Sequence, residues 1–171
     1  MSETTQQETV QEPSVVSSTS IINNVVESVM DLIDDLSLFS TISRGALGTG
    51  NCICCQVGPS SPDEIYMDKN RYISLDLTIN GKHTDLQTLS DAMNSIHESL
   101  PMLTTYPNGN GWQIVDITTI TFPQQIGRED NNAWIMASSL DIKFATYTRN
   151  GYTPPTPETP ETTQVEGTDQ E

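Results

Sequence analysis

The chain has 171 residues, with 7 basic and 23 acidic side chains and a formal net charge of −16. This length suits one domain of ordinary size with terminal tails. The acidic excess argues against a nucleic-acid-binding surface, because phosphate contacts need clustered Lys and Arg. The acidic excess is compatible with a protein through which DNA passes without being bound.

Both ends of the chain have compositions typical of disorder. Residues 1–19 are rich in Ser, Thr, Gln and Glu and bury too little apolar surface to offset the entropy of ordering. Residues 149–171 are acidic and Pro-rich, which favours polyproline II or disorder, or else an extended arm that orders against a neighbouring subunit. We therefore expect a folded domain over residues 20–148, with no secretory signal and no membrane span.

The first expected element is a helix from about Ile21 to Leu36, with Ser20 as its N-cap. Apolar residues recur there at helical spacing, but many are β-branched, so packing against a sheet must stabilise the helix. After a Gly-rich loop, a short strand is expected over Cys52–Val57, ended by Gly58 and Pro59. Residues 58–70 are then expected to form a polar connecting loop.

The clearest local pattern begins at Arg71, where apolar and polar residues alternate as in a strand with one buried face. We expect Asn80-Gly81 to turn this strand. Thr84 and Gln87 form a capping-box pattern at the start of an amphipathic helix that ends before Pro101.

Two further strands are expected, over Trp112–Phe122 and Ala133–Tyr147. Alternation in the first is imperfect around Asp116, which indicates a bulge or a strand covered on both faces. Pro123 is expected to end it, leaving residues 123–132 as a polar loop. The fold class is therefore α+β: a single domain with a mostly antiparallel sheet of four or five strands, two main helices, and Trp112 and Trp134 as packing anchors.

Few side chains could act in catalysis or bind a metal ion, and their spacing suits neither role. Cys52, Cys54 and Cys55 lie within four residues, which suits small half-buried side chains in a reducing compartment better than a ligand cluster. His83 and His97 are expected at surface or boundary positions. The sequence predicts no enzyme, no cofactor and no metal site.

The order of elements resembles the tail-terminator proteins of long-tailed phages, which are also described as minor capsid or head–tail joining proteins. The stretches that carry the resemblance are YISLDLTINGKHTDLQTLSDAMNSIHESL and WQIVDITTITFPQQIGREDNNAWIMASSLDIKF. It covers roughly residues 20–148 and lies in the pattern and order of elements, without an invariant motif.

The resemblance implies a structural virion protein of the tail or neck, assembled in the host cytoplasm. Its copies would form a ring, expected to be a hexamer, that caps the tail tube and joins it to the head. Its partners would be further copies of itself, the tail tube protein and a head–tail connector protein (stopper or adaptor). DNA would pass through the lumen without specific binding.

Two polar segments are the candidate oligomer or tail interfaces. The candidate residues are Asp63, Glu64, Tyr66, Arg128, Glu129 and Asp130. The charged residues at 128–130 are candidates for intersubunit ion pairs, and a solvated turn explains them equally well. Another connector component, such as an adaptor or stopper, and a monomeric phage-encoded binding module remain open as alternatives.

Overall fold

The computed structural model describes residues 18–66, 70–130 and 132–147. These residues form an α+β domain in which six strands make one sheet in the order β1-β2-β3-β6-β5-β4. The elements are α1 (Ser18–Asp34), β1 (Ile42–Arg44), β2 (Cys52–Ile65), β3 (Arg71–His83), α2 (Leu86–Ser99), the 3-10 helix η1 (Leu100–Met102), β4 (Asn108–Gly109), β5 (Trp112–Arg128) and β6 (Trp134–Thr146).

The α+β class is confirmed, but the expected sheet of four or five mostly antiparallel strands is wrong. The sheet has six strands and is mixed, because β1 pairs with β2 in parallel. The two strands that the sequence did not indicate have three and two residues, and segments this short cannot display a two-residue period. The tails were predicted over residues 1–19 and 149–171. Ser18 and Thr19 belong instead to α1, and the rest of both tails lies outside the described residues.

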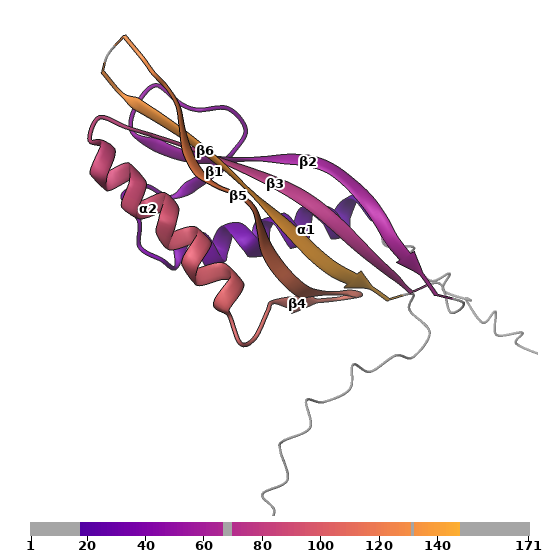
Figure 1. The fold of residues 1–171 in the computed structure, drawn as a ribbon. Coiled ribbons are helices and arrows are strands. Elements are labelled where there is room, and N and C mark those ends of the chain that lie inside the picture. The colour runs from indigo at the N-terminus through magenta and orange to yellow at the C-terminus, as the bar shows by residue number, and fades with distance from the viewer. Residues whose placement is uncertain (1–17, 67–69, 131, 148–171) are drawn as a thin grey trace, which may run out of the picture.

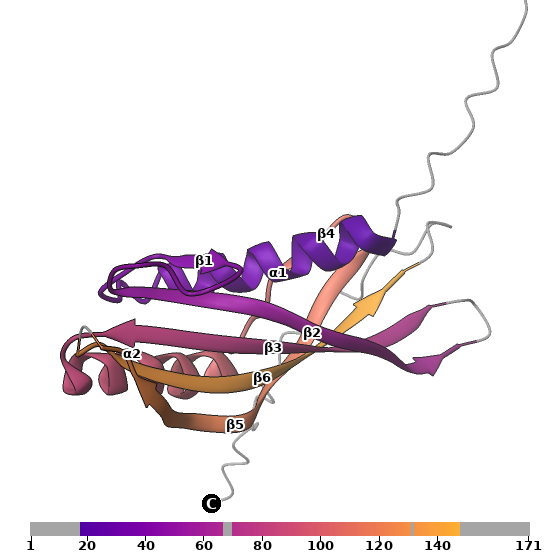
Figure 2. The same ribbon diagram turned by 90° about the horizontal axis from the view of Figure 1, so that it is seen from above.

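Both helices pack on the inner face of a strongly curved sheet (Figures 1 and 2). The apolar residues of α1 and α2 join those of the strands in one core cluster. β3 and β6 form the centre of the sheet. There Leu77 lies opposite Leu140, and Leu75 lies opposite Ile142, with all four side chains fully buried. One core therefore supports the whole described domain.

α1 begins earlier than expected. Its first residue is Ser18, so Ser20 lies inside the helix and is not the N-cap. Val25, Val29 and Ile33 are fully or almost fully buried, as the helical spacing predicted.

The N-cap of α2 is Asp85 and not the expected Thr84. The Asp85 carboxylate accepts hydrogen bonds from the Gln87 and Thr88 backbone N–H groups, both at 3.3 Å, and from Thr88 Oγ1 at 2.6 Å. The bonds from Thr88, and then that from Gln87, lower the pKa of Asp85. The helix ends at Ser99, before Pro101, as expected.

The expected turn at Asn80-Gly81 is wrong, because β3 continues to His83. A Cβ atom added at Gly81 would lie 2.7 Å from Leu89 Cδ1 and 3.0 Å from Met93 Sδ. Glycine is therefore required here by the close approach of α2 to the sheet, and pairing on both sides overrides the local turn tendency.

β2 also continues past its expected end at Gly58-Pro59 and reaches Ile65, so most of the expected 58–70 loop is strand. Its register against β3 shifts between Val57 and Ser60 and again between Pro62 and Glu64. Among the described residues, β1 covers the outer side of β2 only at positions 53–55. The two prolines of this stretch are tolerated because they lie on an edge and at bulges.

Candidate assembly interface

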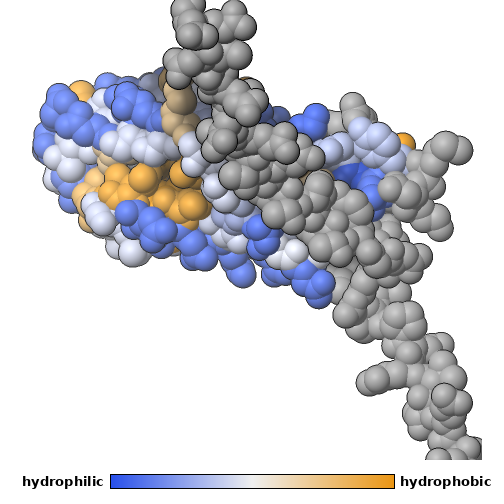
Figure 3. Space-filling model, turned by 90° about the horizontal axis from the view of Figure 1, so that it is seen from below, coloured by the Kyte–Doolittle hydropathy of each residue, from blue (hydrophilic) through white to orange (hydrophobic). Residues whose placement is uncertain are grey.

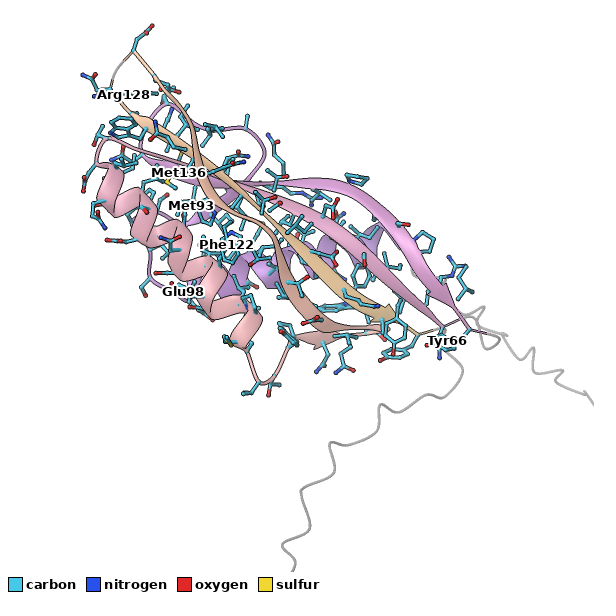
Figure 4. The ribbon with its side chains drawn as sticks, in the orientation of Figure 1. Tyr66, Met93, Glu98, Phe122, Arg128 and Met136 are labelled. Carbon is cyan, nitrogen blue, oxygen red and sulfur yellow. The ribbon has the colours of Figure 1, made fainter. Side chains whose placement is uncertain are left out.

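β5 forms an exposed edge of the sheet. The short strand β4 pairs only with Trp112 and Gln113, and no described strand pairs with the rest of this side of β5. Four large apolar side chains of β5 are exposed, and we call them the β5 edge group: Val115 (43 %), Ile120 (54 %), Phe122 (69 %) and Ile126 (58 %). Figure 4 places Phe122 beside α2. Edges of this kind are surfaces on which another chain can dock.

Irregular pairing explains why β5 exposes these side chains. β5 does not end at Pro123 as expected but continues to Arg128. Its register against β6 shifts four times, and one shift spans Pro123, between Thr121 and Gln124. Each extra residue changes the face on which the following side chains lie. Proline has no N–H to donate, so β5 is a poor template for continuous backbone pairing but a good carrier of exposed apolar side chains.

A second apolar group lies where β2 meets β3. We call Ile65 and Tyr66 the hairpin tip; they are 64 % and 50 % exposed. The Tyr66 ring meets the Tyr72 ring edge to face, with 5.8 Å between centroids. Figures 1 and 2 show this end of the two strands projecting beyond the helices.

Apolar surface is also present on the helical side of the molecule. Leu86 at the start of α2 is 36 % exposed, and Met102 at the end of η1 is 81 % exposed. Figure 3 looks onto this side and shows hydrophobic surface gathered in one patch between hydrophilic residues.

The six residues predicted as interface positions fall into two groups at opposite ends of the sheet, as Figure 4 shows for Tyr66 and Arg128. β3 runs from one end to the other over 13 residues, which corresponds to about 40 Å at about 3.3 Å per residue. Asp63 and Glu64 belong to β2 and not to a loop, and their side chains lie outside the described part of the structure. Tyr66 is exposed at the hairpin tip.

At the other end, Arg128 is the last residue of β5, and only Glu129 and Asp130 belong to the connection that follows. The Arg128 guanidinium lies 4.4 Å from the centroid of the Trp134 ring, and its Nε donates to the Asn132 carbonyl at 3.5 Å. Trp134 is therefore half-buried beneath a cation, whereas Trp112 is buried as predicted.

Glu129 is already paired within its own chain. Its carboxylate accepts hydrogen bonds from Lys82 Nζ at 3.2 and 3.3 Å. Lys82 is only 2 % exposed and also donates to the Gly48 carbonyl. A buried ammonium needs such partners, so this pair connects the 45–51 loop, the end of β3 and the turn between β5 and β6. The intersubunit ion pairs predicted at residues 128–130 remain a prediction. If Glu129 forms one of them, its carboxylate would be shared between Lys82 of its own chain and a cation of the neighbouring copy.

His97 is buried between α2 and β5, so its expected surface or boundary position is wrong. Its Nδ1 lies 2.9 Å from Thr119 Oγ1, and its buried Nε2 has no partner in the described structure. Burial lowers the pKa of His97, which favours the neutral ring. The ring centroid is 6.1 Å from that of Phe122, so this histidine supports the strand that carries the β5 edge group.

The remaining reactive side chains form no ligand set. All three cysteines are free; Cys54 and Cys55 are fully buried, more deeply than the half-buried positions expected, while Cys52 is half-buried. Burial raises the pKa of Cys54 and Cys55, which keeps both thiols protonated. Within the ranges 18–66, 70–130 and 132–147, no group of three or more His, Cys, Asp or Glu side chains is placed to hold a metal ion. None of the described helices has the length and apolar character that crossing a membrane requires.

Sequence reasoning did not identify the β5 edge group. The signal was present in WQIVDITTITF, where apolar residues occur at both odd and even positions instead of keeping to one. Such a strand is either covered on both faces or bulged at an edge. The loss of alternation around Asp116 indicates a bulge or a strand covered on both faces, and it does not by itself distinguish a covered strand from an exposed edge.

Within the described part of the chain, the sheet thus has a long edge without a neighbouring strand and exposes apolar side chains, which are properties of an assembly component. Residues 45–146 match the model of a family described as bacteriophage tail terminator protein. The chain belongs to this family, and it is a structural protein of the phage tail.

A solved structure and the curated proteins add little to this assignment. The chain is similar to one from the virion of a native gene transfer agent particle, with 12 % identity, a TM-score of 0.43, and coverage of 69 % of this chain and 85 % of that chain. That likeness is too distant to carry an argument. No curated protein sequence matches this chain.

Proposed function

We propose that this chain is a tail terminator whose copies close into a six-membered ring on the end of the tail tube. The ring stops growth of the tube and joins the tail to the head. The observation that carries the proposal is the family match, which spans every strand of the sheet except β1. The protein then belongs to the virion neck and is assembled in the host cytoplasm.

The exposed surface supports an assembly role. The β5 edge group and the hairpin tip present large apolar side chains to solvent. Single exposed apolar residues are ordinary, but groups of them along an unpaired strand mark sites of protein association. Further copies of the chain, the tail tube protein and a stopper or adaptor of the head–tail connector are the proposed partners.

The charge of the chain supports passage of DNA through the ring without binding. The net charge is −16, and a lumen poor in cations does not hold a polyanion. The outer face of the sheet is one candidate lining, because it carries Asp76 and Asp141 directly opposite each other and exposes Asp116. Replacing Asp116 by Lys is then expected to slow ejection of DNA, while the same change at Asp35 in the turn after α1 is not; equal ejection rates in both variants would contradict this lining.

The ring is tested by measuring the mass of the full-length protein by light scattering and by imaging it with negative stain. A closed ring of six supports the proposal. A ring of twelve would indicate an adaptor instead. If the protein is a monomer, purified tail tubes are added, and a six-fold cap on the tube ends supports assembly on a template. A protein that stays monomeric with tubes present would overturn the terminator role in favour of a binding module.

A further inference from the structure

We propose that the contact between neighbouring copies joins two different surfaces: the hairpin tip of one copy docks on the β5 edge group of the next. Ile65 and Phe122 are the central residues of the contact. This inference rests on the proposed ring and names the surfaces that build it.

Apolar contact is the available source of attraction between copies. With 23 acidic and 7 basic residues, like charges dominate, and copies repel one another at long range. Of the few cations, Lys82 is buried against Glu129 and Arg128 lies over Trp134 within the same chain. Ile65 and Phe122 are 64 % and 69 % exposed, so covering them removes apolar surface from water.

Ile65 and Phe122 cannot meet within one chain. Thr121, next to Phe122, pairs with Ser139, which lies opposite Thr78 of β3, whereas Ile65 pairs with Arg71. The seven-residue separation along β3 corresponds to about 23 Å at about 3.3 Å per residue. A contact between them is therefore intermolecular.

The chain's own termini are poor candidates to cover the β5 edge group. Residues 148–171 consist mainly of Thr, Pro, Glu, Gly and Gln, with Tyr152 and Val165 as the large apolar side chains, and residues 1–17 offer only Met1 and three valines. Neither segment has the apolar density needed to bury Ile120, Phe122 and Ile126 together. A second copy does carry a compact, projecting apolar group.

The placement of the two surfaces favours a ring over a closed dimer. Contacts between two unlike surfaces repeat head to tail, and they close into a ring when the rotation permits. Pairing of two β5 edges would instead close at two copies. The four register shifts and Pro123 disfavour that pairing, because they interrupt the backbone ladder that two edges would need.

Cross-linking through introduced cysteines tests the contact. In a Cys52→Ser background, Ile65→Cys and Phe122→Cys are made separately and mixed under mild oxidation, with tail tubes added if they are needed for assembly. The expected result is a cross-linked dimer only in the mixture. A single chain carrying both changes is expected to give a ladder that ends at the ring size. The matched control pairs Ile65→Cys with Asn94→Cys, an exposed position on α2, and is expected to give at least about 10-fold less cross-link.

A non-covalent variant complements the cross-linking. Phe122→Ser removes an exposed side chain, so the free energy of unfolding is expected to be unchanged. The protein concentration needed for assembly is expected to rise at least about 10-fold. Three outcomes would overturn the contact: rings that form without the cross-link, self-cross-linking of Phe122→Cys alone, or unchanged assembly of Phe122→Ser. A chain that forms no ring even on tail tubes would overturn the ring itself, which separates the two failures.

Discussion

The centre of the sheet and its β5 edge are built from similar residues but differ in regularity. β3 and β6 pair over 13 residues without a register shift, and their inward side chains are fully buried along the middle of both strands. β5 pairs with β6 through four register shifts and exposes the β5 edge group. A regular alternation of apolar and polar residues thus accompanies a strand with one face buried in the core. A broken alternation accompanies an edge strand that is exposed and available to another molecule.

The largest expected contrast between the two regions comes from truncating one apolar side chain in each. Leu140→Ala at the centre is expected to cost about 2–5 kcal/mol of unfolding free energy, because it leaves a cavity between fully buried neighbours. Phe122→Ala at the edge is expected to stay within about 0.5 kcal/mol. Urea unfolding at one protein concentration measures both changes, and a similar loss in the two variants would show that Phe122 is buried.

Glycine positions sharpen the comparison. Gly81→Val is expected to cost about 1–3 kcal/mol, because even a Cβ there would come within 2.7 Å of Leu89 Cδ1 beneath α2. Gly127→Val in β5 is the matched control: an added Cβ would have no atom within 4 Å, and its cost is expected to be near zero. Thermal unfolding of the two variants should differ by several degrees; equal midpoints would contradict the close approach of α2.

The buried ammonium group at the end of the sheet where β5 turns into β6 is expected to make stability sensitive to the loss of its charged partner. Glu129→Gln removes the charged partner of Lys82, which is 2 % exposed, and is expected to cost about 1–3 kcal/mol. Asp130→Asn changes the neighbouring exposed carboxyl and is expected to have almost no effect. Chemical unfolding compares them. Indifference to Glu129→Gln would mean that the pair contributes nothing to stability.

The smallest expected effect on the free energy of unfolding comes from His97, which lies between α2 and β5, and this effect depends on pH. Burial lowers the pKa of His97 from its ordinary value of 6.5, so the unfolded chain binds its proton more readily than the folded chain. The contribution of His97 to the free energy of unfolding is therefore fully present above about pH 6.5, and it decreases as the pH falls below that value.

A His97→Gln variant provides the control for this pH dependence. It is expected to lose less stability than the parent between pH 7.5 and pH 5, as measured by urea unfolding. Asp85 does not interfere, because its pKa is lowered from 3.8 and it titrates below this range. Parallel pH profiles for parent and variant would show that His97 is not buried in solution.

The sequence predicted the parts of the fold whose side chains keep one period. The buried faces of β3 and β6 and the apolar stripe of α2 follow directly from spacing, and α1 differs only in its bounds. The sequence failed at Asn80-Gly81, Gly58-Pro59 and Pro123. At each place a local turn or breaker signal competed with strand pairing or helix packing from distant parts of the chain, and the distant contacts prevailed.

The interface residues predicted from the sequence remain a prediction, and the structure adds exposed apolar residues that the sequence did not indicate. Polar residues at Asp63, Glu64 and 128–130 were selected because charged loops are exposed, yet Glu129 pairs with Lys82 inside its own chain. Val115, Ile120 and Phe122 were expected in a strand that is bulged or covered on both faces, and Ile126 was expected in a polar loop, so none of them was predicted as an interface residue. Exposure at an edge depends on which strands lie beside it, and no local pattern contains that information.

The most direct test of the account is the mass and shape of the full-length protein in solution and on purified tail tubes. Light scattering and negative-stain imaging are expected to find a closed six-fold ring, free or seated on the tube end, which the Phe122→Ser variant assembles far less readily. A chain that remains monomeric in the presence of tail tubes would contradict the central claim that these copies build the ring at the end of the tail.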